Sequence, residues 1–344
     1  MKNILVTGGA GFIGSAFVRL IVNDYPNYHI VTFDKLTYAG NLDNLQPLKG
    51  AQNHTFVQGD IADLEGVRGV LEEHDIDTVV NFAAESHVDR SILDPEAFIR
   101  TDVFGVYRLL EAAHQHGIGR FMQVSTDEVY GDVESGFSTE DDNFLPNSPY
   151  AASKASGELM VRSYHVTYGM DTVTSRGSNT YGPYQYPEKL IPFFITEAAD
   201  DRSLPVYGDG MQVRDWLHVD DHASGVLKVL ENGKSGEVYN IAGEDIRHNI
   251  DVIKLLLDIM DKPQSLIKYV RDREGHDRRY AMSAQKAEKE LGWERQHTFE
   301  AGLKQTVQWY LDNEWWWRKI KTGEYLEYYK KQYAERLAQA ESTS

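Results

Sequence analysis

The sequence contains no cysteine, no long run of apolar residues and no surplus of positive charge. Without cysteine the chain can form neither a disulfide nor a thiolate metal site, which fits a reducing compartment. The apolar run at residues 4–6 is too short for a signal peptide, and no stretch is long enough to span a bilayer. We therefore expect a cytoplasmic protein that holds no metal and does not enter a membrane.

Acidic residues outnumber basic ones by 53 to 35, which gives a formal net charge of −18 at pH 7. Such a surface repels nucleic acid and acidic membranes, so we expect neither as a partner. An anionic ligand must then bind at a local group of cationic side chains. Residues 205–214 and 269–280 hold such a group, which consists of Tyr207, Arg214, Arg271, Arg273, His276, Arg278 and Arg279. They predict an anion pocket, although Arg278 and Arg279 could equally be solvated or ion-paired at the surface.

The order of apolar and polar segments predicts an α/β fold. With 344 residues and 41% apolar content, the chain can bury a large core. Buried strands are expected at residues 3–7, 29–33, 55–58, 78–82, 120–125 and 171–176. Helices are expected at residues 15–23, 64–74, 94–116 and 150–168. This alternation is typical of a Rossmann-type, doubly wound parallel sheet.

A glycine-rich turn joins the first expected strand to the first expected helix. Gly9, Gly11 and Gly14 fit the pattern G-x-G-x-x-G, and Gly8 with the last two fits G-x-x-G-x-x-G equally well. Glycines here allow a tight turn and let the backbone approach a pyrophosphate at the helix N-terminus. The second strand leads to Asp34, where an acidic residue would bind a ribose diol and repel a 2′-phosphate. The pattern predicts NAD rather than NADP, although Lys35 acts in the opposite direction.

The regular alternation ends after residue 178, where Pro, Gly, Arg and aromatic residues become more frequent. Residues 215–230 and 237–241 are expected to return to the sheet. The predicted NAD-binding domain therefore comprises residues 1–178 and 215–243. A smaller α/β substrate-binding domain comprises residues 179–214 and 244–335, and residues 336–344 are expected to form a frayed tail. We interpret Trp315, Trp316 and Trp317 as core packing rather than as a binding site.

Residues 125–154 concentrate a hydroxyl, two carboxylates, a phenol and an amine. Tyr150 and Lys154 are four residues apart at the start of an expected helix, so their side chains share one face. A nearby ammonium group favours a phenolate, and we expect Lys154 to lower the pKa of Tyr150. The alternative interpretation is an exposed Tyr and Lys on a surface helix.

Thr126, Asp127 and Glu128 follow the strand expected at residues 120–125. Acidic residues in a first helical turn are also favoured by the helix dipole, without any catalytic role. In an open α/β sheet, however, ligands bind at the carboxyl ends of the strands. Two adjacent carboxyl groups with pKa values pushed apart can supply one acid and one base. Beside a dinucleotide motif and a Tyr/Lys pair, they suggest redox chemistry joined to an elimination.

These motifs resemble those of extended short-chain dehydrogenase/reductases and, within that superfamily, those of the dTDP-glucose 4,6-dehydratase family. The resemblance covers nearly the whole chain and rests on TGGAGFIG at 7–14, NFAAESHVD at 81–89, STDEVYG at 125–131, YGPYQYPEK at 181–189, YGDG at 207–210, RDW at 214–216 and GHDRRY at 275–280. The glycine and Tyr/Lys motifs are common to the superfamily. The pair Asp127 and Glu128 is specific to dehydratases of this type.

The resemblance implies a cycle that begins when Tyr150 takes the proton of the sugar 4-hydroxyl while the C4 hydride moves to NAD, assisted by Thr126 and Lys154. Glu128 would then remove the C5 proton while Asp127 protonates the departing C6 hydroxyl. Return of the hydride to C6 and a proton to C5 would give dTDP-4-dehydro-6-deoxyglucose. The resemblance also implies that NAD stays bound, and that a homodimer forms through the helices expected at residues 94–116 and 150–168.

Two sets of binding residues are expected. The cofactor-binding set is Gly8, Gly11, Phe12, Ile13, Gly14, Asp34, Lys35, Thr37, Asp60, Ile61, Ala83, Ala84, Tyr150 and Lys154. The resemblance implies a substrate-binding set of Ser86, Asn179, Glu188, Lys189, Tyr207, Arg214, Asn249, Arg273 and His276.

The chain departs from the family pattern at Ala151, Thr180 and Glu274, where Ser, Asn and Pro are frequent. Glu274 adds a negative charge beside Arg273, which would weaken substrate binding. The alternative enzymes are a nucleotide-sugar 4-epimerase, which has no need of Asp127 and Glu128, and a 4,6-dehydratase for another nucleotide sugar. A catalytically silent, NAD-sensing regulator is an alternative from another class, but it would have no reason to keep the acid, base, phenol and amine together.

Overall fold

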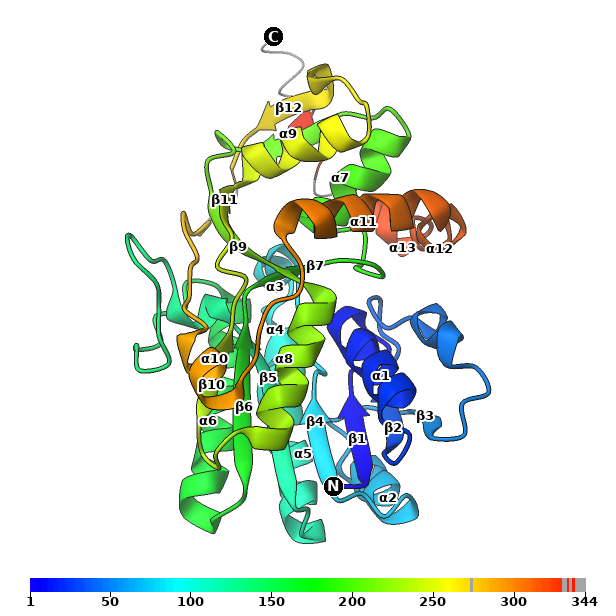
Figure 1. Cartoon of the computed structure of the whole chain (residues 1–344), viewed down its shortest axis with the longest axis vertical. Helices are drawn as coiled ribbons and strands as arrows, with labels where there is room; N and C mark the ends of the chain where they lie inside the picture. Colours follow the sequence, from blue (N-terminus) through cyan, green and yellow to red (C-terminus); the bar gives the residue numbers. More distant parts are fainter. Residues whose placement is uncertain (273–274, 330–332, 334–335, 338–344) are drawn as a thin grey trace.

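A computed structural model of the chain describes residues 1–272, 275–329, 333, 336 and 337. Arg273 and Glu274 therefore lie outside the described residues, as does the expected tail apart from Arg336 and Leu337. Figure 1 shows a large parallel sheet flanked by helices, with a smaller lobe above it in this view. No helix within the described ranges is long and apolar enough to cross a membrane.

Within the described residues, seven parallel strands form the main sheet, in the order β10-β6-β5-β4-β1-β2-β3. The strands are β1 (Asn3–Thr7), β2 (His29–Asp34), β3 (His54–Gln58), β4 (Thr78–Asn81), β5 (Arg120–Thr126), β6 (Thr172–Gly177) and β10 (Val238–Ile241). Alternate residues of β1 face opposite sides, because Ile4 and Val6 pack in one core and Leu5 in the other. The predicted doubly wound α/β fold is confirmed.

Helices cover both faces of the main sheet. Apolar residues of α1 (Phe12–Asp24), α8 (Val219–Asn232) and α10 (Gln285–Leu291) share one core. Residues of α2 (Leu64–Glu73), α5 (Val106–His116) and α6 (Pro149–Tyr168) share the core on the other face. The shorter helical segments are η1 (Leu42–Leu48), α3 (Val88–Leu93), α4 (Pro95–Phe98), η2 (Ile99–Gly105) and η3 (Asp127–Tyr130).

The helix expected at residues 94–116 is present without a break from Pro95 to His116, but its middle turns are π-helical. Pro95 starts α4, and the wide π-helical turns of η2 precede the regular helix α5. Helix α6 approaches η2 closely here: a Cβ atom at Gly157 would lie only 2.7 Å from the carbonyl oxygen of Asp102. Wide turns of this kind often occur at functional sites. Here they carry Asp102, whose carboxylate accepts a hydrogen bond from Ser153 Oγ at 2.7 Å.

The smaller lobe has its own apolar core. Its elements are α7 (Leu190–Ala199), β8 (Leu204–Tyr207), α9 (Asn249–Ile259), η4 (Gln264–Leu266), β12 (Ile267–Val270), α11 (Phe299–Asp312), α12 (Glu314–Ile320) and α13 (Glu324–Tyr329). Trp316 and Trp317 are buried in this core, as interpreted from the sequence. The same interpretation is wrong for Trp315, which is 48% exposed.

A second sheet of β11-β9-β7 connects the smaller lobe to the main sheet. Its strands are β7 (Asn179–Tyr181), β9 (Val213–His218) and β11 (Ile246–His248). The expectation that residues 215–230 return to the main sheet is therefore wrong for the strand, because β10 already pairs with β6 at that edge. It is correct for α8, which packs against α1.

Candidate active site

The glycine turn lies between β1 and α1 at the carboxyl edge of the main sheet. Gly8 has a φ of 67°, a conformation that glycine adopts without steric cost. A Cβ atom at Gly14 would lie 2.3 Å from the carbonyl oxygen of Gly8, so the turn and the helix meet only because that atom is missing. The N-terminus of α1 has no side-chain cap and borders a cavity. Its backbone N–H groups are therefore suited to hold a pyrophosphate.

Asp34 ends β2 beside this turn. Its carboxylate accepts hydrogen bonds from the backbone N–H of Ala10 at 3.0 Å and of Leu36 at 2.8 Å. Burial raises the pKa of Asp34, and these bonds oppose the rise. Lys35 is paired with Asp60 at 2.8 Å. The cation that could have favoured NADP is thus engaged by a carboxylate, and Asp34 lines the cavity beside the glycine turn.

A cavity of about 290 Å³ follows the carboxyl edge of the sheet. All cofactor-binding residues predicted from the sequence line it, and so do the five predicted catalytic residues and Ser86. The glycine cradle, the uncapped helix and Asp34 fit a dinucleotide along this edge. The structure thus brings the two predicted sets together, while the role of each residue stays a prediction.

The predicted catalytic residues lie where β5 meets η3 and α6. Thr126 ends β5, and its Oγ1 accepts from the backbone N–H of Glu128 at 3.3 Å and donates to Asp127 Oδ1 at 3.1 Å. Ser148 caps α6 by accepting from the backbone N–H of Ala151 at 3.1 Å. The cap starts the helix at the point that places Tyr150 beside Thr126 in the wall of the same cavity.

Asp127 has the electrostatics of a proton donor. Burial raises its pKa from 3.8 to about 7, and the neighbouring Glu128 adds to the rise. Among the described residues its buried oxygen Oδ2 has no hydrogen-bond partner, which is costly for an ionised group and tolerable for a neutral one. A carboxyl group that is partly protonated at neutral pH can donate a proton, as the sequence pattern suggested for one of the two acids.

The expected lowering of the pKa of Tyr150 is wrong for these side chains. Burial raises that pKa well above 10, and the negative charge of Glu128 raises it further. The ammonium group of Lys154 is also buried, which lowers its own pKa, and it donates to the carbonyl oxygen of Val124 at 2.9 Å. Sequence spacing placed Tyr150 and Lys154 on one helix face but could not show how deeply the helix is buried.

Asp102 is a buried residue that the sequence reasoning missed. Burial raises its pKa to about 7, while the charge of Lys154 acts to lower it. Its carboxylate accepts from Ser153 Oγ and from the backbone N–H of Glu85 at 2.9 Å. Asp102 thus anchors the η2 turns to the helix that carries the phenol and the amine. The one sequence signal for Asp102 was its position, as an acidic residue in the middle of a mostly apolar expected helix.

A second cavity adjoins the first and extends into the smaller lobe. Both cavities are lined by Glu128, Asn179, Glu188 and Lys189. The second is also lined by four more predicted substrate-binding residues, namely Tyr207, Arg214, Asn249 and His276. Ser86 lines only the first cavity, and Arg273 lies outside the described residues. Glu128 therefore stands where a cofactor and a substrate would meet.

The cationic residues predicted to form an anion pocket divide into two groups. Arg214 is buried and lies over the ring of Tyr280, with its guanidinium carbon 4.3 Å from the ring centroid. Arg278 instead forms an exposed ion pair with Asp209 at 2.8 Å. The surface interpretation of Arg278 was therefore the correct alternative.

Tyr280 is a further residue that the sequence reasoning did not select. Its hydroxyl oxygen lies 3.5 Å from Glu128 Oε2 and donates a hydrogen bond to Asp277. Burial and the charge of Glu128 raise the pKa of Tyr280. The residue belongs to the GHDRRY motif, but only a folded chain shows that it reaches a carboxylate 152 positions away.

Three residues outside these cavities, His218, Asp220 and His297, bring possible ligand atoms within 4.8 Å of one another. The two imidazole rings are stacked with centroids 4.0 Å apart, so their in-plane lone pairs do not converge on one point. His218 Nδ1 accepts from the backbone N–H of Asp220 at 3.3 Å, and His297 pairs with Asp221 at 3.0 Å. Helix capping and ion pairing explain this group, and we propose no metal there.

Comparison with known proteins agrees with this site. The family described as GDP-mannose 4,6 dehydratase matches residues 5–306. The chain is 48% identical to a dTDP-glucose 4,6-dehydratase of Escherichia coli, over 96% of this chain and 98% of that protein. It is 49% identical to one of Xanthomonas campestris pv. campestris (strain B100), over 94% and 97% of the two chains. The chain belongs to the dTDP-glucose 4,6-dehydratase family.

Solved structures support the same family membership. The dTDP-glucose 4,6-dehydratase DesIV of Streptomyces venezuelae, determined with NAD bound, has a TM-score of 0.91 and 48% identity, and the match covers 93% of this chain and all of that one. A UDP-glucose 4-epimerase of Thermotoga maritima matches with a TM-score of 0.85 and 31% identity, over 91% of this chain and all of that one. Dehydratases and epimerases share this fold, so the side chains of the site must distinguish them.

Proposed function

We propose that the protein converts dTDP-glucose to dTDP-4-dehydro-6-deoxyglucose and water. The observation that carries the proposal is the pair Asp127 and Glu128, one held partly protonated at neutral pH by burial, at the junction of the two cavities. A 4-epimerase needs a phenol and a dinucleotide but no such pair. Membership of the dTDP-glucose 4,6-dehydratase family supports the choice of substrate.

The residues along the first cavity would hold NAD. The uncapped N-terminus of α1 and the glycine turn would bind the pyrophosphate, and Asp34 would bind the adenosine ribose. When bound, NAD supplies the acceptor and later the donor of the hydride. Because Asp34 disfavours a 2′-phosphate and Lys35 is engaged by Asp60, the site favours NAD over NADP.

Oxidation at C4 would require Tyr150 to take the proton of the 4-hydroxyl as a phenolate, so the positive charges of Lys154 and of bound NAD must offset the rise in its pKa that burial and Glu128 cause. Thr126 lines the same cavity as the phenol and would orient it, and Lys154 is the buried cation one turn further along α6. A ketone at C4 acidifies the hydrogen at C5, which prepares the elimination.

Elimination requires a base at C5 and an acid at the C6 oxygen. Glu128 faces both cavities and would accept the C5 proton. Asp127 would donate its proton to the departing C6 hydroxyl, which leaves as water. Thr126 holds both acids in place, through the backbone N–H of Glu128 and through Asp127 Oδ1. Return of the hydride to C6 and of a proton to C5 completes the product.

The second cavity would hold the nucleotide diphosphate. Arg214 is a buried cation in a chain of net charge −18, and a buried guanidinium there favours an anionic group. Lys189 lines both cavities and donates to the carbonyl oxygen of Ser86 at 2.5 Å, which places it between the two ligands. Asn249 starts α9 at the wall of this cavity.

A homodimer is part of the proposal. Leu159 and Val166 are 54% and 65% exposed and share one face of α6. The neighbouring turns of η2 expose Ile99 and Phe104, at 59% and 42%. An apolar surface of this kind marks an interaction site. Pairing α5 and α6 with those of a second copy would bury it.

The domain division and the location also stay proposals. We assign residues 1–178 and 215–243 to NAD binding and residues 179–214 and 244–335 to nucleotide-sugar binding. The absence of cysteine supports a cytoplasmic location.

The test of the proposed function is incubation of the purified protein with a panel of sugar nucleotides. We expect dTDP-glucose to give a product lighter by one water that carries a carbonyl group. Conversion of a UDP-sugar to its 4-epimer without loss of mass would instead identify an epimerase. Loss of water from another nucleotide sugar in preference to dTDP-glucose would identify that sugar nucleotide as the substrate.

A further inference from the structure

A buried amide, Asn44 of η1, joins the glycine turn to the smaller lobe. Its side chain is 1% exposed. Asn44 Nδ2 donates to the carbonyl oxygen of Ala10 at 2.9 Å, and Asn44 Oδ1 accepts from the indole Nε1 of Trp316 at 3.0 Å. The orientation of the amide follows from its partners, because a carbonyl only accepts and an indole N–H only donates. One side chain thus forms a continuous hydrogen-bonded path from α12 to the cofactor turn.

Ala10 lies within the glycine turn, and both of its backbone polar groups are held. Its N–H donates to Asp34, and its carbonyl oxygen accepts from Asn44 and from the backbone N–H of Asn41 at 3.0 Å. The planar peptide unit connects that carbonyl to the N–H of Gly11, so fixing one orients the other. Gly11 lines the cofactor cavity. The hold on Ala10 therefore fixes the shape of the turn that would bind the pyrophosphate.

On the smaller-lobe side, α12 presents Trp316 and Lys319 to η1. Trp316 is 1% exposed, and Lys319 Nζ pairs with Asp43 Oδ2 at 2.5 Å. These two residues are three apart on the helix, and their partners Asp43 and Asn44 are adjacent. Two neighbouring contacts therefore fasten the same turn of α12 to the same turn of η1.

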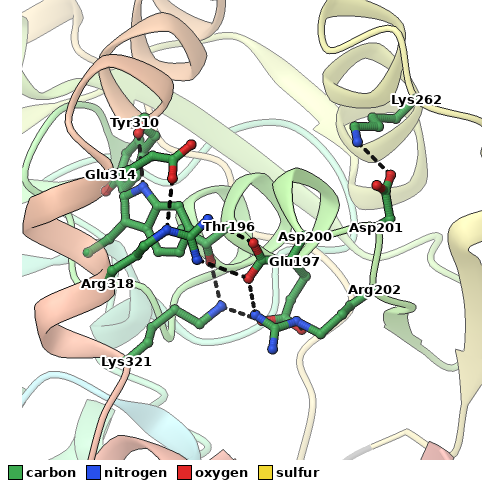
Figure 2. Close-up of polar contacts among 11 residues, drawn as sticks. Thr196, Glu197, Asp200, Asp201, Arg202, Lys262, Tyr310, Glu314, Arg318 and Lys321 are labelled. Carbon is green, nitrogen blue, oxygen red and sulfur yellow. Dashed lines mark hydrogen bonds and ion pairs between the residues drawn. The ribbon is translucent and has the colours of Figure 1, made fainter.

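The opposite side of α12 is fastened to α7, as Figure 2 shows. Arg318 pairs with Asp200 at 2.9 Å, just after α7 ends. Lys321 pairs with the buried Glu197 and donates to Thr196 Oγ1 at 3.1 Å. The segment that immediately precedes α7 contains Glu188 and Lys189, which line both cavities. The path thus continues from α12 to the substrate cavity.

A second contact runs beside the first. Arg19 of α1 donates to the carbonyl oxygen of Asn44 at 2.8 Å, and its guanidinium carbon lies 4.4 Å from the centroid of the Tyr184 ring. Tyr184 meets Trp316 edge to face, with centroids 5.8 Å apart. The next two residues of the chain, Gln185 and Tyr186, line the cofactor cavity. Asn44 is therefore the point at which both contacts converge.

We propose that Asn44 is a positioning residue that couples the two ligand sites, so that a nucleotide bound in the smaller lobe slows the release of NAD from the glycine turn. The inference rests on the proposed function, because it requires one ligand in each cavity. Slower release at an unchanged association rate means tighter binding of NAD, and coupling between binding free energies is reciprocal, so NAD should also tighten nucleotide binding. Removing one partner leaves the other as a buried polar group without a hydrogen bond, which is why single substitutions should be sufficient to weaken the link.

The experiment measures the release of NAD from the purified holoenzyme, with and without saturating dTDP. Trp316→Phe keeps an aromatic ring but removes the N–H donor, and Asn44→Leu removes both hydrogen bonds of the amide. We expect each variant to release NAD about tenfold faster than the parent when dTDP is present. This corresponds to a decrease of about 1.4 kcal/mol in the activation free energy of release. The double variant should be no faster than Asn44→Leu alone, because both changes cut the same path. Trp315→Phe is the matched control, since its exposed indole lies outside this path and NAD release should not change.

Three outcomes would overturn the inference. One is a parent protein in which dTDP does not slow NAD release. The second is a rate in Trp316→Phe that equals the parent rate, and this conservative variant decides the question if Asn44→Leu does not fold. The third is equal acceleration with and without dTDP, which would indicate a structural role only. A parent protein that retains no NAD would contradict the proposed function itself, whereas retained NAD with unchanged variants would contradict the coupling alone.

Discussion

Replacing Asp127 by Asn should stabilise the folded protein at high pH and at the same time slow the reaction. Burial raises the pKa of Asp127 from 3.8 to about 7, with a further contribution from Glu128. The difference is about 3 pKa units, and each unit corresponds to about 1.36 kcal/mol, so ionising this carboxyl in the folded protein costs up to about 4 kcal/mol. An amide of nearly the same shape does not ionise.

The sign follows from proton binding. Between pH 4 and pH 7 the folded protein keeps a proton on Asp127 that the unfolded chain loses. This contribution to stability is therefore fully present below about pH 4, falls as pH rises, and levels off above the folded pKa. Asp127→Asn removes the fall. The free energy of unfolding of the variant, minus that of the parent, should grow by up to about 4 kcal/mol between pH 4 and pH 8.

The assay is urea unfolding at these two pH values with NAD saturating in every sample. Asp209→Asn is the control, because Arg278 lowers the pKa of the exposed Asp209 through a hydrogen bond and this variant should gain no stability with rising pH. In turnover, Asp127→Asn should slow loss of the C6 hydroxyl by about 10²–10⁴-fold, as expected for a lost general acid. A variant whose stability changes with pH as the parent's does would show that Asp127 is not held protonated, and the reasoning would fail.

Three further predictions concern the cofactor, the substrate and the assembly. Protein purified without added cofactor should release NAD rather than NADP on denaturation; a majority of NADP would contradict the role given to Asp34. Arg214→Ala should weaken dTDP-glucose binding by at least about tenfold, because a charge-assisted contact to the diphosphate is lost, and it should leave the NAD content unchanged. An equal loss of NAD would show that the assignment of Arg214 to the substrate site is wrong. Leu159→Arg, measured by sedimentation beside the solvent-exposed control Glu134→Arg, should convert a dimer to a monomer, and an unchanged mass would locate the interface elsewhere.

The parts of the site that sequence alone could predict are those set by local spacing. Gly8 and Gly14 were identifiable because a turn between a strand and a helix requires residues without side chains where backbones touch. Tyr150 and Lys154 were identifiable because the helix period puts them on one face. The strands at residues 3–7 and 120–125 were identifiable because each is a short apolar run followed by polar residues.

The parts that sequence could not predict depend on contacts between distant segments. The pKa of Tyr150 rises because its helix is buried under other elements, and no spacing rule gives that depth. Tyr280 reaches Glu128, and Asn44 reaches Trp316, across 152 and 272 positions of the chain. The sheet to which β9 belongs was predicted wrongly for the same reason, because a strand pattern does not say which sheet edge is already occupied.

The most direct test of the central claim is single turnover of dTDP-glucose in deuterated solvent by Glu128→Gln. Oxidation at C4 does not need this base, so NADH and a 4-keto-glucose nucleotide should accumulate on the enzyme. Exchange at C5 should fall by about a hundredfold or more, the effect of losing a general base. Tyr150→Phe, as a comparison, should form neither NADH nor product. If Glu128→Gln and Asp127→Asn both turned over at the parent rate while Tyr150→Phe was inactive, the pair would have no part in the reaction and the site would be that of an epimerase.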